Sequence, residues 1–173
     1  MKKGTRGFSL IELLIVVAII LIIAAIAIPN LLRSRIAANQ ASAVGSLRTL
    51  NTAEVTYSTT YNTGYSATLS DLGPPAASSP TPTSTAAGLI DEVLAGMSTP
   101  GGNATTAQTS QKSGYQFVYA PGSTTAPVTT YSFTASPISP GTTGTNYYYT
   151  DQSGVIRQNS TTTASSTDSP LAG

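Results

Sequence analysis

The stretch from Phe8 to Ile28 reads FSLIELLIVVAIILIIAAIAI and decides how this chain is organised. From Leu13 to Ile28 every residue is apolar, and the only charged residue of the stretch is Glu12. As an α-helix the stretch rises about 30 Å, which matches the hydrocarbon thickness of a bilayer. A core helix of a small soluble domain would carry polar residues on its outer face, and this one has none after Glu12. The stretch therefore predicts a helix that lies in lipid or in equally dry surroundings.

A basic flank precedes this helix and contains Lys2, Lys3 and Arg6. A secretory signal peptide begins in the same way, and Ala25-Ile26-Ala27 offers it a small-x-small cleavage site. The apolar run is longer than the 7–15 residues typical of such signals, and an acidic residue inside it serves no purpose in a discarded segment. The alternative hypothesis is a secreted or anchored binding module with a mere signal or tether, which predicts cleavage near Ala27 or none.

Glu12 is the strongest functional candidate in the chain. A carboxylate at the centre of a membrane helix costs about 2.5–3.5 kcal/mol, so ionisable residues there indicate a function and a partner. A cut between Gly7 and Phe8 would create an ammonium group four residues before Glu12. In staggered copies, Glu12 of one chain would then pair with the Phe8 amine of its neighbour. A wrong stagger would leave a buried charge alone, so this pair would fix the register of the copies.

Residues 30–61 continue as an amphipathic helix. They contain no Pro and a single Gly, Gly45, and one face of the predicted helix packs on a small domain. Pro29 removes a backbone hydrogen bond and clashes with the preceding turn, which predicts a kink at the junction. The plain alternative at Pro29 is a boundary between a membrane helix and an extramembrane helix. The apolar residues that recur at three- and four-residue steps are Leu32, Ile36, Ala43, Val44, Leu47, Leu50 and Val55.

The run Gly7-Phe8-Ser9-Leu10-Ile11-Glu12-Leu13, set behind K-K-G-T-R, resembles the leader and N-terminal helix of the type IV pilin and pseudopilin superfamily. The match covers Met1 to about Pro29 closely and extends loosely to about Tyr61. The resemblance implies that a membrane-embedded prepilin peptidase cuts after Gly7 and N-methylates the new Phe8 amine. It also implies that Glu12 serves subunit addition and that Pro29 marks a kink or a melted stretch.

The resemblance further implies a set of partners and a location. The chain would be a single-pass precursor in the bacterial inner membrane, surrounded by lipid, before inner-membrane machinery assembles it. The product would be a homo-oligomeric helical filament, either a cell-surface pilus or a periplasmic pseudopilus. The pseudopilin of a type II secretion system is the alternative to a pilus subunit. Hydroxyl-rich loops favour the surface pilus.

The expected fold is α+β, with a long N-terminal helical spine packed against a small antiparallel β-sheet head. The organisation is a leader at 1–7, a hydrophobic assembly helix at 8–29, an amphipathic continuation at 30–61 and a head at 62–173. Within the head, a short helix is expected over Leu89–Met97, followed by a polar loop through Ser113. The expected strands are Tyr115–Ala120, Thr130–Ala135, Asn146–Thr150 and Val155–Arg157, with a hairpin turn at Asp151–Gly154. The expected buried rings are Phe117, Tyr119 and Phe133, with Tyr147 or Tyr149.

Composition argues against catalysis. The chain has no Cys, His or Trp, which excludes thiol nucleophiles, His general bases and Cys/His zinc sites. The seven carboxylates are scattered, and Asp91 and Glu92 would point about 100° apart on a helix. Asp151 lacks the acidic neighbours of a calcium loop, and a net charge of +1 provides no field for nucleic acid. We expect a structural protein without catalytic residues, metal or cofactor.

Overall fold

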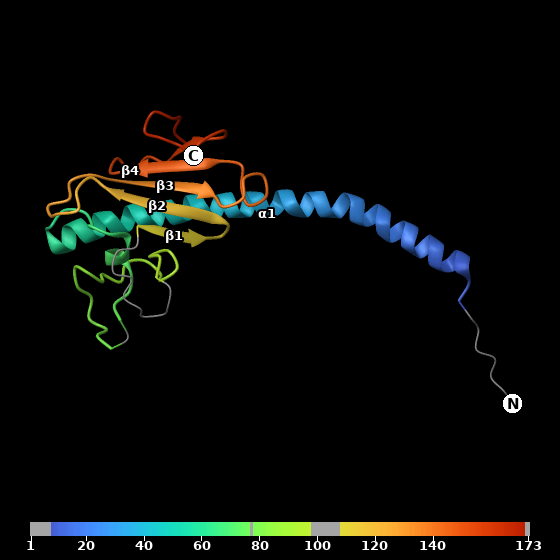
Figure 1. The fold of residues 1–173 in the computed structure, drawn as a ribbon, viewed down its shortest axis with the longest axis horizontal. Coiled ribbons are helices and arrows are strands. Elements are labelled where there is room, and N and C mark those ends of the chain that lie inside the picture. The colour runs from blue at the N-terminus through green and yellow to red at the C-terminus, as the bar shows by residue number, and fades with distance from the viewer. Residues whose placement is uncertain (1–7, 77, 98–107, 172–173) are drawn as a thin grey trace. The chain divides into compact units, whose positions relative to one another are not determined.

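The computed structural model describes residues 8–76, 78–97 and 108–171 (Figure 1). The predicted leader, including Gly7, lies outside the described residues. The chain divides into two compact units, Met1–Arg35 and Ile36–Gly173. One 52-residue helix, α1 (Leu10–Tyr61), contributes residues to both units. The structure is therefore α+β, as the sequence predicted.

The first unit consists, in its described part, of the N-terminal half of α1. Its large apolar side chains are all exposed, from 46% for Val17 to 79% for Leu10. The structure has one helix long and apolar enough to cross a membrane, judged by length and composition among the described residues. A surface of this kind is stable only where water is excluded, so this half of α1 requires lipid or other protein around it.

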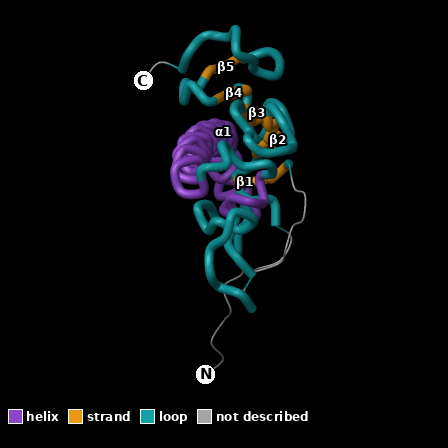
Figure 2. The backbone as a smooth tube through the Cα atoms, turned by 90° about the vertical axis from the view of Figure 1, so that its left-hand side faces the viewer, coloured by secondary structure: helices purple, strands orange, loops and turns teal. Residues whose placement is uncertain are grey.

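The second unit contains a five-stranded antiparallel sheet in which every strand pairs with the next one along the chain. Within this unit, the C-terminal half of α1 lies beside one face of the sheet (Figure 2). The strand order is therefore that of a simple meander. The strands are β1 (Thr109–Lys112), β2 (Tyr115–Pro121), β3 (Tyr131–Pro137), β4 (Tyr147–Asp151) and β5 (Arg157–Asn159).

The core lies between α1 and the sheet because both elements are amphipathic with their own periods. Alternate residues of β2 and β3 are buried, as the period of two requires. Phe117, Tyr119 and Phe133 point into this core, as predicted. On α1 the buried residues recur at helical spacing and are Ala43, Ser46, Leu47, Leu50, Ala53, Glu54 and Tyr57. Val55, expected on this face, is instead 55% exposed, and its neighbour Glu54 is buried.

Polar contacts join α1 to the sheet along the edge of the core. The Asn51 side-chain amide donates to Thr150 Oγ1 over 2.8 Å, and its oxygen accepts from the Tyr131 hydroxyl at 3.2 Å. Earlier on α1, Asn39 Nδ2 donates to the Thr143 carbonyl over 2.9 Å. These bonds satisfy polar groups beside an apolar core, so they fix which part of the helix faces which strand.

The helix predicted over Leu89–Met97 was wrong, since the structure has turns there. Its hydrogen bonds have mixed spacing: Ala95 N binds the Asp91 carbonyl four residues back, whereas Gly96 N binds Val93 only three back. The Asp91 carboxylate caps the turn by accepting from Leu94 N at 3.0 Å. A segment this short, bounded by glycines, cannot propagate a helix. The short helix that the described residues do contain is the 3₁₀-helix η1 (Leu69–Leu72).

Two strand predictions also need correction. The polar loop expected through Ser113 contains β1, which pairs with β2 through a two-residue turn. Ser113 and Gly114 have φ of 50° and 75°, as a type I′ hairpin turn requires. In β4 the buried ring is Tyr148, and Tyr147 and Tyr149 are half-buried, because Ala135 of the inner face pairs with Tyr148.

The last strand begins two residues further along the chain than predicted. The turn over Asp151–Gly154 is confirmed by a hydrogen bond from Gly154 N to the Asp151 carbonyl at 2.9 Å. β5 begins at Arg157 and ends at Asn159, whereas the predicted strand began at Val155 and ended at Arg157. The chain returns along β5, where Gln158 N donates to the Ser169 carbonyl over 3.0 Å. Asp168 holds the returning segment beside β5 by accepting hydrogen bonds from Asn159 Nδ2 and Ser165 N.

Substitution of two glycines by alanine should have opposite effects on the stability of the chain. Gly64 has a φ of +82°, and a Cβ there would collide with the backbone of Val128, so we expect Gly64→Ala to lower the free energy of unfolding by at least about 1 kcal/mol. Gly45 lies exposed inside α1 with open space around it, so Gly45→Ala should raise that free energy by about 0.5–1 kcal/mol. Urea unfolding of the full chain in detergent micelles measures both. A stabilising Gly64→Ala would contradict the assigned backbone.

Candidate assembly and processing site

The candidate site at the N-terminus begins just before α1. Gly7, the predicted cleavage residue, lies outside the described part of the chain, and Phe8 is the first described residue. Phe8 precedes the helix, and its side chain is 82% exposed. The described residues therefore leave most of this ring uncovered at the point where the chain enters the helix.

Glu12 lies in the first turn of α1 and acts as part of a helix cap. Its Oε2 accepts from the Ser9 backbone N–H over 3.1 Å, and Leu13 N makes the first helical bond to the Ser9 carbonyl at 3.3 Å. The sequence S-x-x-E thus forms the glutamate half of a capping box. The positive end of the helix dipole favours a carboxylate at this position. Glu12 is therefore held at the helix start by its own chain.

Pro29 lies inside α1, and the helix is continuous through it. Proline has no N–H, so the Ala25 carbonyl one turn back lacks its usual helical donor. The kink predicted at Pro29 stays a prediction, as does the alternative of a boundary there.

A second site, which the sequence analysis did not single out, lies inside the 36–173 unit around Glu54. The Glu54 carboxyl is fully buried, with Oε1 2.7 Å from Ser66 Oγ and Oε2 2.9 Å from Ser66 N. Ser66 Oγ is also 3.2 Å from the Tyr119 hydroxyl, which donates to the Ser66 carbonyl at 2.6 Å. We call Glu54, Ser66 and Tyr119 the Glu54 cluster.

Burial dominates the electrostatics of this cluster. It raises the pKa of Glu54 from its ordinary 4.5 to about 7, although hydrogen bonds from Ser66 partly oppose this. Burial likewise raises the pKa of Tyr119, so its hydroxyl keeps its proton. A signal for Glu54 was present in the sequence, because it lies seven residues after Leu47 and four after Leu50, on the buried stripe.

Comparisons with known proteins bear on the N-terminal site. Residues 2–28 match the family described as the prokaryotic N-terminal methylation motif. The chain is 52% identical over 52 residues to the type IV major pilin protein PilA of Myxococcus xanthus. Over its N-terminal region the chain is similar to the type IV pilin superfamily.

A second relative is similar over a shorter stretch. The chain is 62% identical over 37 residues to the type IV wide pilus major component PilA4 of Thermus thermophilus. These matches cover 30% and 21% of this chain, and 24% and 28% of the respective relatives. The chain thus spans about a quarter of the length of the curated relatives it matches. No solved structure matches it.

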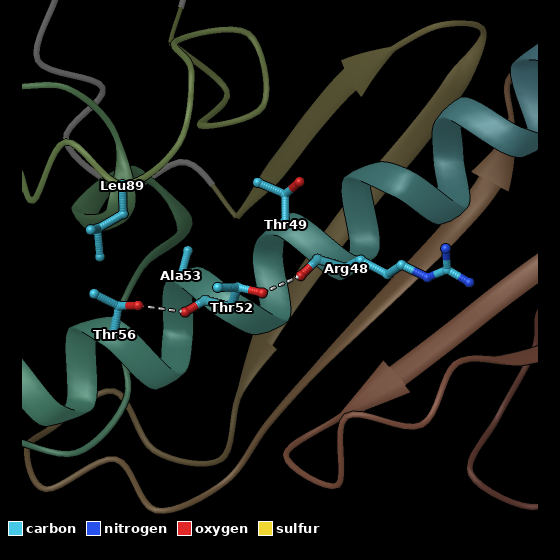
Figure 3. A pocket seen from close by; sticks show the side chains of 6 residues that line it. All are labelled: Arg48, Thr49, Thr52, Ala53, Thr56 and Leu89. Carbon is cyan, nitrogen blue, oxygen red and sulfur yellow. Dashed lines mark hydrogen bonds between the residues drawn. The ribbon is translucent and has the colours of Figure 1, made fainter.

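In the second unit, the surface of α1 carries a shallow hollow. Its volume is about 310 Å³, and it is lined by Arg48, Thr49, Thr52, Ala53, Thr56 and Leu89. The Thr52 and Thr56 hydroxyls donate back to the carbonyls of Arg48 and Thr52, at 3.0 and 2.8 Å (Figure 3). Both hydroxyl protons are used within the helix, and the Arg48 side chain extends away from Leu89 and Thr56, so these residues form no catalytic constellation (Figure 3).

The other carboxylates have structural surroundings. Asp91 forms an ion pair with Lys112 at 2.7 Å in addition to its cap, and Asp151 accepts from Ser153 N at 2.9 Å within its turn. Among the described residues, no group of three or more Asp, Glu, His or Cys side chains converges in a way that could hold a metal ion. Asp91 therefore caps its turn and pairs with Lys112, and Asp151 stabilises the turn that follows β4.

Proposed function

We propose that the chain is a structural subunit of a type IV pilus-like filament that polymerises through the N-terminal half of α1. One observation supports this most directly. The matched motif at residues 2–28 includes the first part of α1, whose large apolar side chains the described residues leave uncovered. In the precursor, lipid would cover this surface. In the filament, the N-terminal halves of α1 from neighbouring copies would replace the lipid. Close packing of their side chains would stabilise the assembly.

Processing at Gly7–Phe8 would prepare the site for assembly. A prepilin peptidase would cut after Gly7, and the same enzyme would N-methylate Phe8. The new ammonium group would then lie at the positive end of its own helix dipole, which is unfavourable for a cation. Glu12 of a neighbouring copy could compensate that charge in dry surroundings, and only at the correct axial stagger. Glu12 would thus set the register, and Pro29 would provide a kink.

The proposal includes the partners and location that the motif implies. The precursor would be a single-pass protein of the bacterial inner membrane, assembled there by inner-membrane machinery. Both relatives reported above are named as pilus components, which favours a cell-surface pilus over the pseudopilus of a type II secretion system. Catalysis, cofactor chemistry and nucleic-acid binding have no part in the proposal.

The test is the mass and N-terminal sequence of the protein from native membranes and from sheared surface material. We expect a chain that begins at Phe8 with one added methyl group, present in sheared filaments. Gly7→Leu should leave the precursor uncut, because a large side chain at the cleaved position obstructs the peptidase. Mature protein that stays with the cell and is absent from sheared material would favour the pseudopilin. A chain that begins near Ile28 would refute the proposal, because the assembly helix would have been discarded.

A further inference from the structure

Glu54 is a buried acid, and no cation lies close to its carboxyl group among the described residues. Its carboxyl group lies at the junction of α1, β2 and the segment 62–68 that follows the helix. The titratable groups in its electrostatic surroundings, as far as the structure describes them, are Tyr57 of α1, Tyr119 of β2, Tyr131 of β3 and Asp71 of η1. None of these is a cation, and Asp71 repels a negative charge on Glu54. Ionisation of Glu54 therefore leaves an uncompensated charge in the core.

The hydrogen bonds of the cluster oppose the effect of burial on Glu54 but do not cancel it. When Glu54 is neutral, its O–H can donate to Ser66 Oγ, Ser66 Oγ to the Tyr119 oxygen, and Tyr119 to the Ser66 carbonyl. Each of these three contacts then has one hydrogen. When Glu54 is ionised, Ser66 N, the Ser66 hydroxyl and the Tyr119 hydroxyl are the donors that stabilise the carboxylate. They offset only part of the desolvation, so charging Glu54 still has a net cost.

The segment that Glu54 holds is attached to other described residues on both sides of Ser66. Asn62 and Gly64 have positive φ angles of 55° and 82°, so the chain reverses direction directly after the helix. Beyond the turn, Tyr65 N donates to the Val128 carbonyl over 2.8 Å, and Gln108 reaches the Ala67 carbonyl at 3.3 Å. Ser66 lies between these two contacts, and Glu54 binds both its backbone and its hydroxyl.

We propose that the Glu54 cluster is a pH-responsive joint: the neutral carboxyl fastens segment 62–68 to α1 and β2, and its ionisation loosens that segment and admits water. This inference concerns the Ile36–Gly173 unit alone and is independent of the proposed assembly function. This joint differs from a surface ion pair in two ways. Glu54 lies inside the core, and no described cation stabilises its ionised form.

The direction of the pH dependence follows from linkage. The folded chain holds the Glu54 proton up to about pH 7, whereas the unfolded chain releases it near 4.5. The stabilisation is therefore fully present below pH 4.5 and is lost as the pH rises to about 7. Over this interval the ratio of folded to unfolded chain should fall by a factor on the order of 10² relative to a variant without the acid.

The experiment compares urea unfolding of the full chain and of Glu54→Gln, in detergent micelles, from pH 4.5 to 8. The amide keeps an acceptor for Ser66 N and cannot ionise, so we expect Glu54→Gln to match the parent at pH 4.5 and to exceed its stability at pH 8. Glu92→Gln is the control for removal of a glutamate from another part of the head, and it should keep the pH slope of the parent. Parallel curves for the parent and Glu54→Gln would overturn the proposal.

Two measurements on the unmutated side chain keep the test valid if Glu54→Gln does not fold. The chain has three glutamates, so ¹³C labelling of glutamate gives three carboxyl signals to titrate by NMR. We expect one of them to titrate near pH 7, and titration of all three near 4.5 would overturn the proposal. At pH 8 the Ser66 amide should exchange its hydrogen at least about tenfold faster than the Phe133 amide, after correction for intrinsic rates. Equal protection of both amides at pH 8 would show that no local loosening occurs.

Discussion

Glu12→Ala should abolish filament assembly while leaving the membrane level of the chain unchanged. Loss of the carboxylate would leave the neighbouring Phe8 ammonium without a partner in dry surroundings, a penalty of about 3–5 kcal/mol per copy. A penalty of this size at every added copy lowers the affinity of each addition by more than about 10². The measurement is the ratio of sheared filament to membrane-bound chain, by immunoblot. Insertion itself should not suffer, since removal of a charge from a membrane helix is favourable.

Glu12→Gln is the matched variant, because the helix cap of Glu12 needs no charge, whereas its proposed pair with the Phe8 amine does. The glutamine oxygen can still accept from Ser9 N, as Glu12 Oε2 does at 3.1 Å, so the helix cap survives. We expect Glu12→Gln to fail in assembly almost as completely as Glu12→Ala. Normal filament yield with Glu12→Gln would show that the residue acts as a cap and that the charge pair is wrong.

Phe133→Ala should remove most of the stability of the head. Phe133 is fully buried on β3, and its ring centroid lies 4.7 Å from that of Tyr119 and 5.6 Å from that of Tyr131. Truncation of a buried phenylalanine costs about 3–5 kcal/mol in lost burial and cavity formation. A domain of this size has about 5–15 kcal/mol in total, so the variant should unfold at much lower urea concentration. Tyrosine fluorescence and circular dichroism of the full chain in micelles would follow the transition.

Thr134→Ala is the control for Phe133→Ala because Thr134 is the next residue and faces the opposite side of the same strand. Its side chain is half-buried and lies opposite Tyr149 and Val118 on the neighbouring strands. We expect a cost within about 1 kcal/mol, in the range of single cross-strand contacts. Similar losses for Phe133→Ala and Thr134→Ala would contradict the assignment of the core to the α1-facing side of the sheet.

Helix α1 could be read from the sequence because its signals are strong and local. The apolar run defines its first half without any reference to the rest of the chain. The second half shows helical spacing up to Tyr61, where the turn at Asn62 to Gly64 begins. The identity of the N-terminal site could also be read, since a motif of contiguous residues needs no tertiary information. The roles predicted for Gly7, Phe8, Glu12 and Pro29 stay proposals.

The head was harder to predict because tertiary partners decide its details. β1 has the sequence TSQK, which lacks any apolar alternation, and it forms because β2 offers unpaired backbone groups beside a tight turn. Three consecutive tyrosines contain no period-two signal, so pairing with β3 decides that Tyr148 is the buried one. Glu54 was missed because an acid on an apolar stripe is unusual, and its partner Ser66 is twelve residues away along the chain.

The meander order of the sheet has a consequence for the sequence of events in folding. Each strand pairs with the next, so the sheet can form by closing short loops. Docking of α1 instead joins residues 99–105 positions apart, as in Asn51 with Thr150 and Gln40 with Thr145. Closing a loop ten times longer costs about 2 kcal/mol more in chain entropy. We therefore expect the strands to pair first and the helix to dock last. During synthesis the apolar stripe of α1 would therefore stay exposed until β4 has left the ribosome.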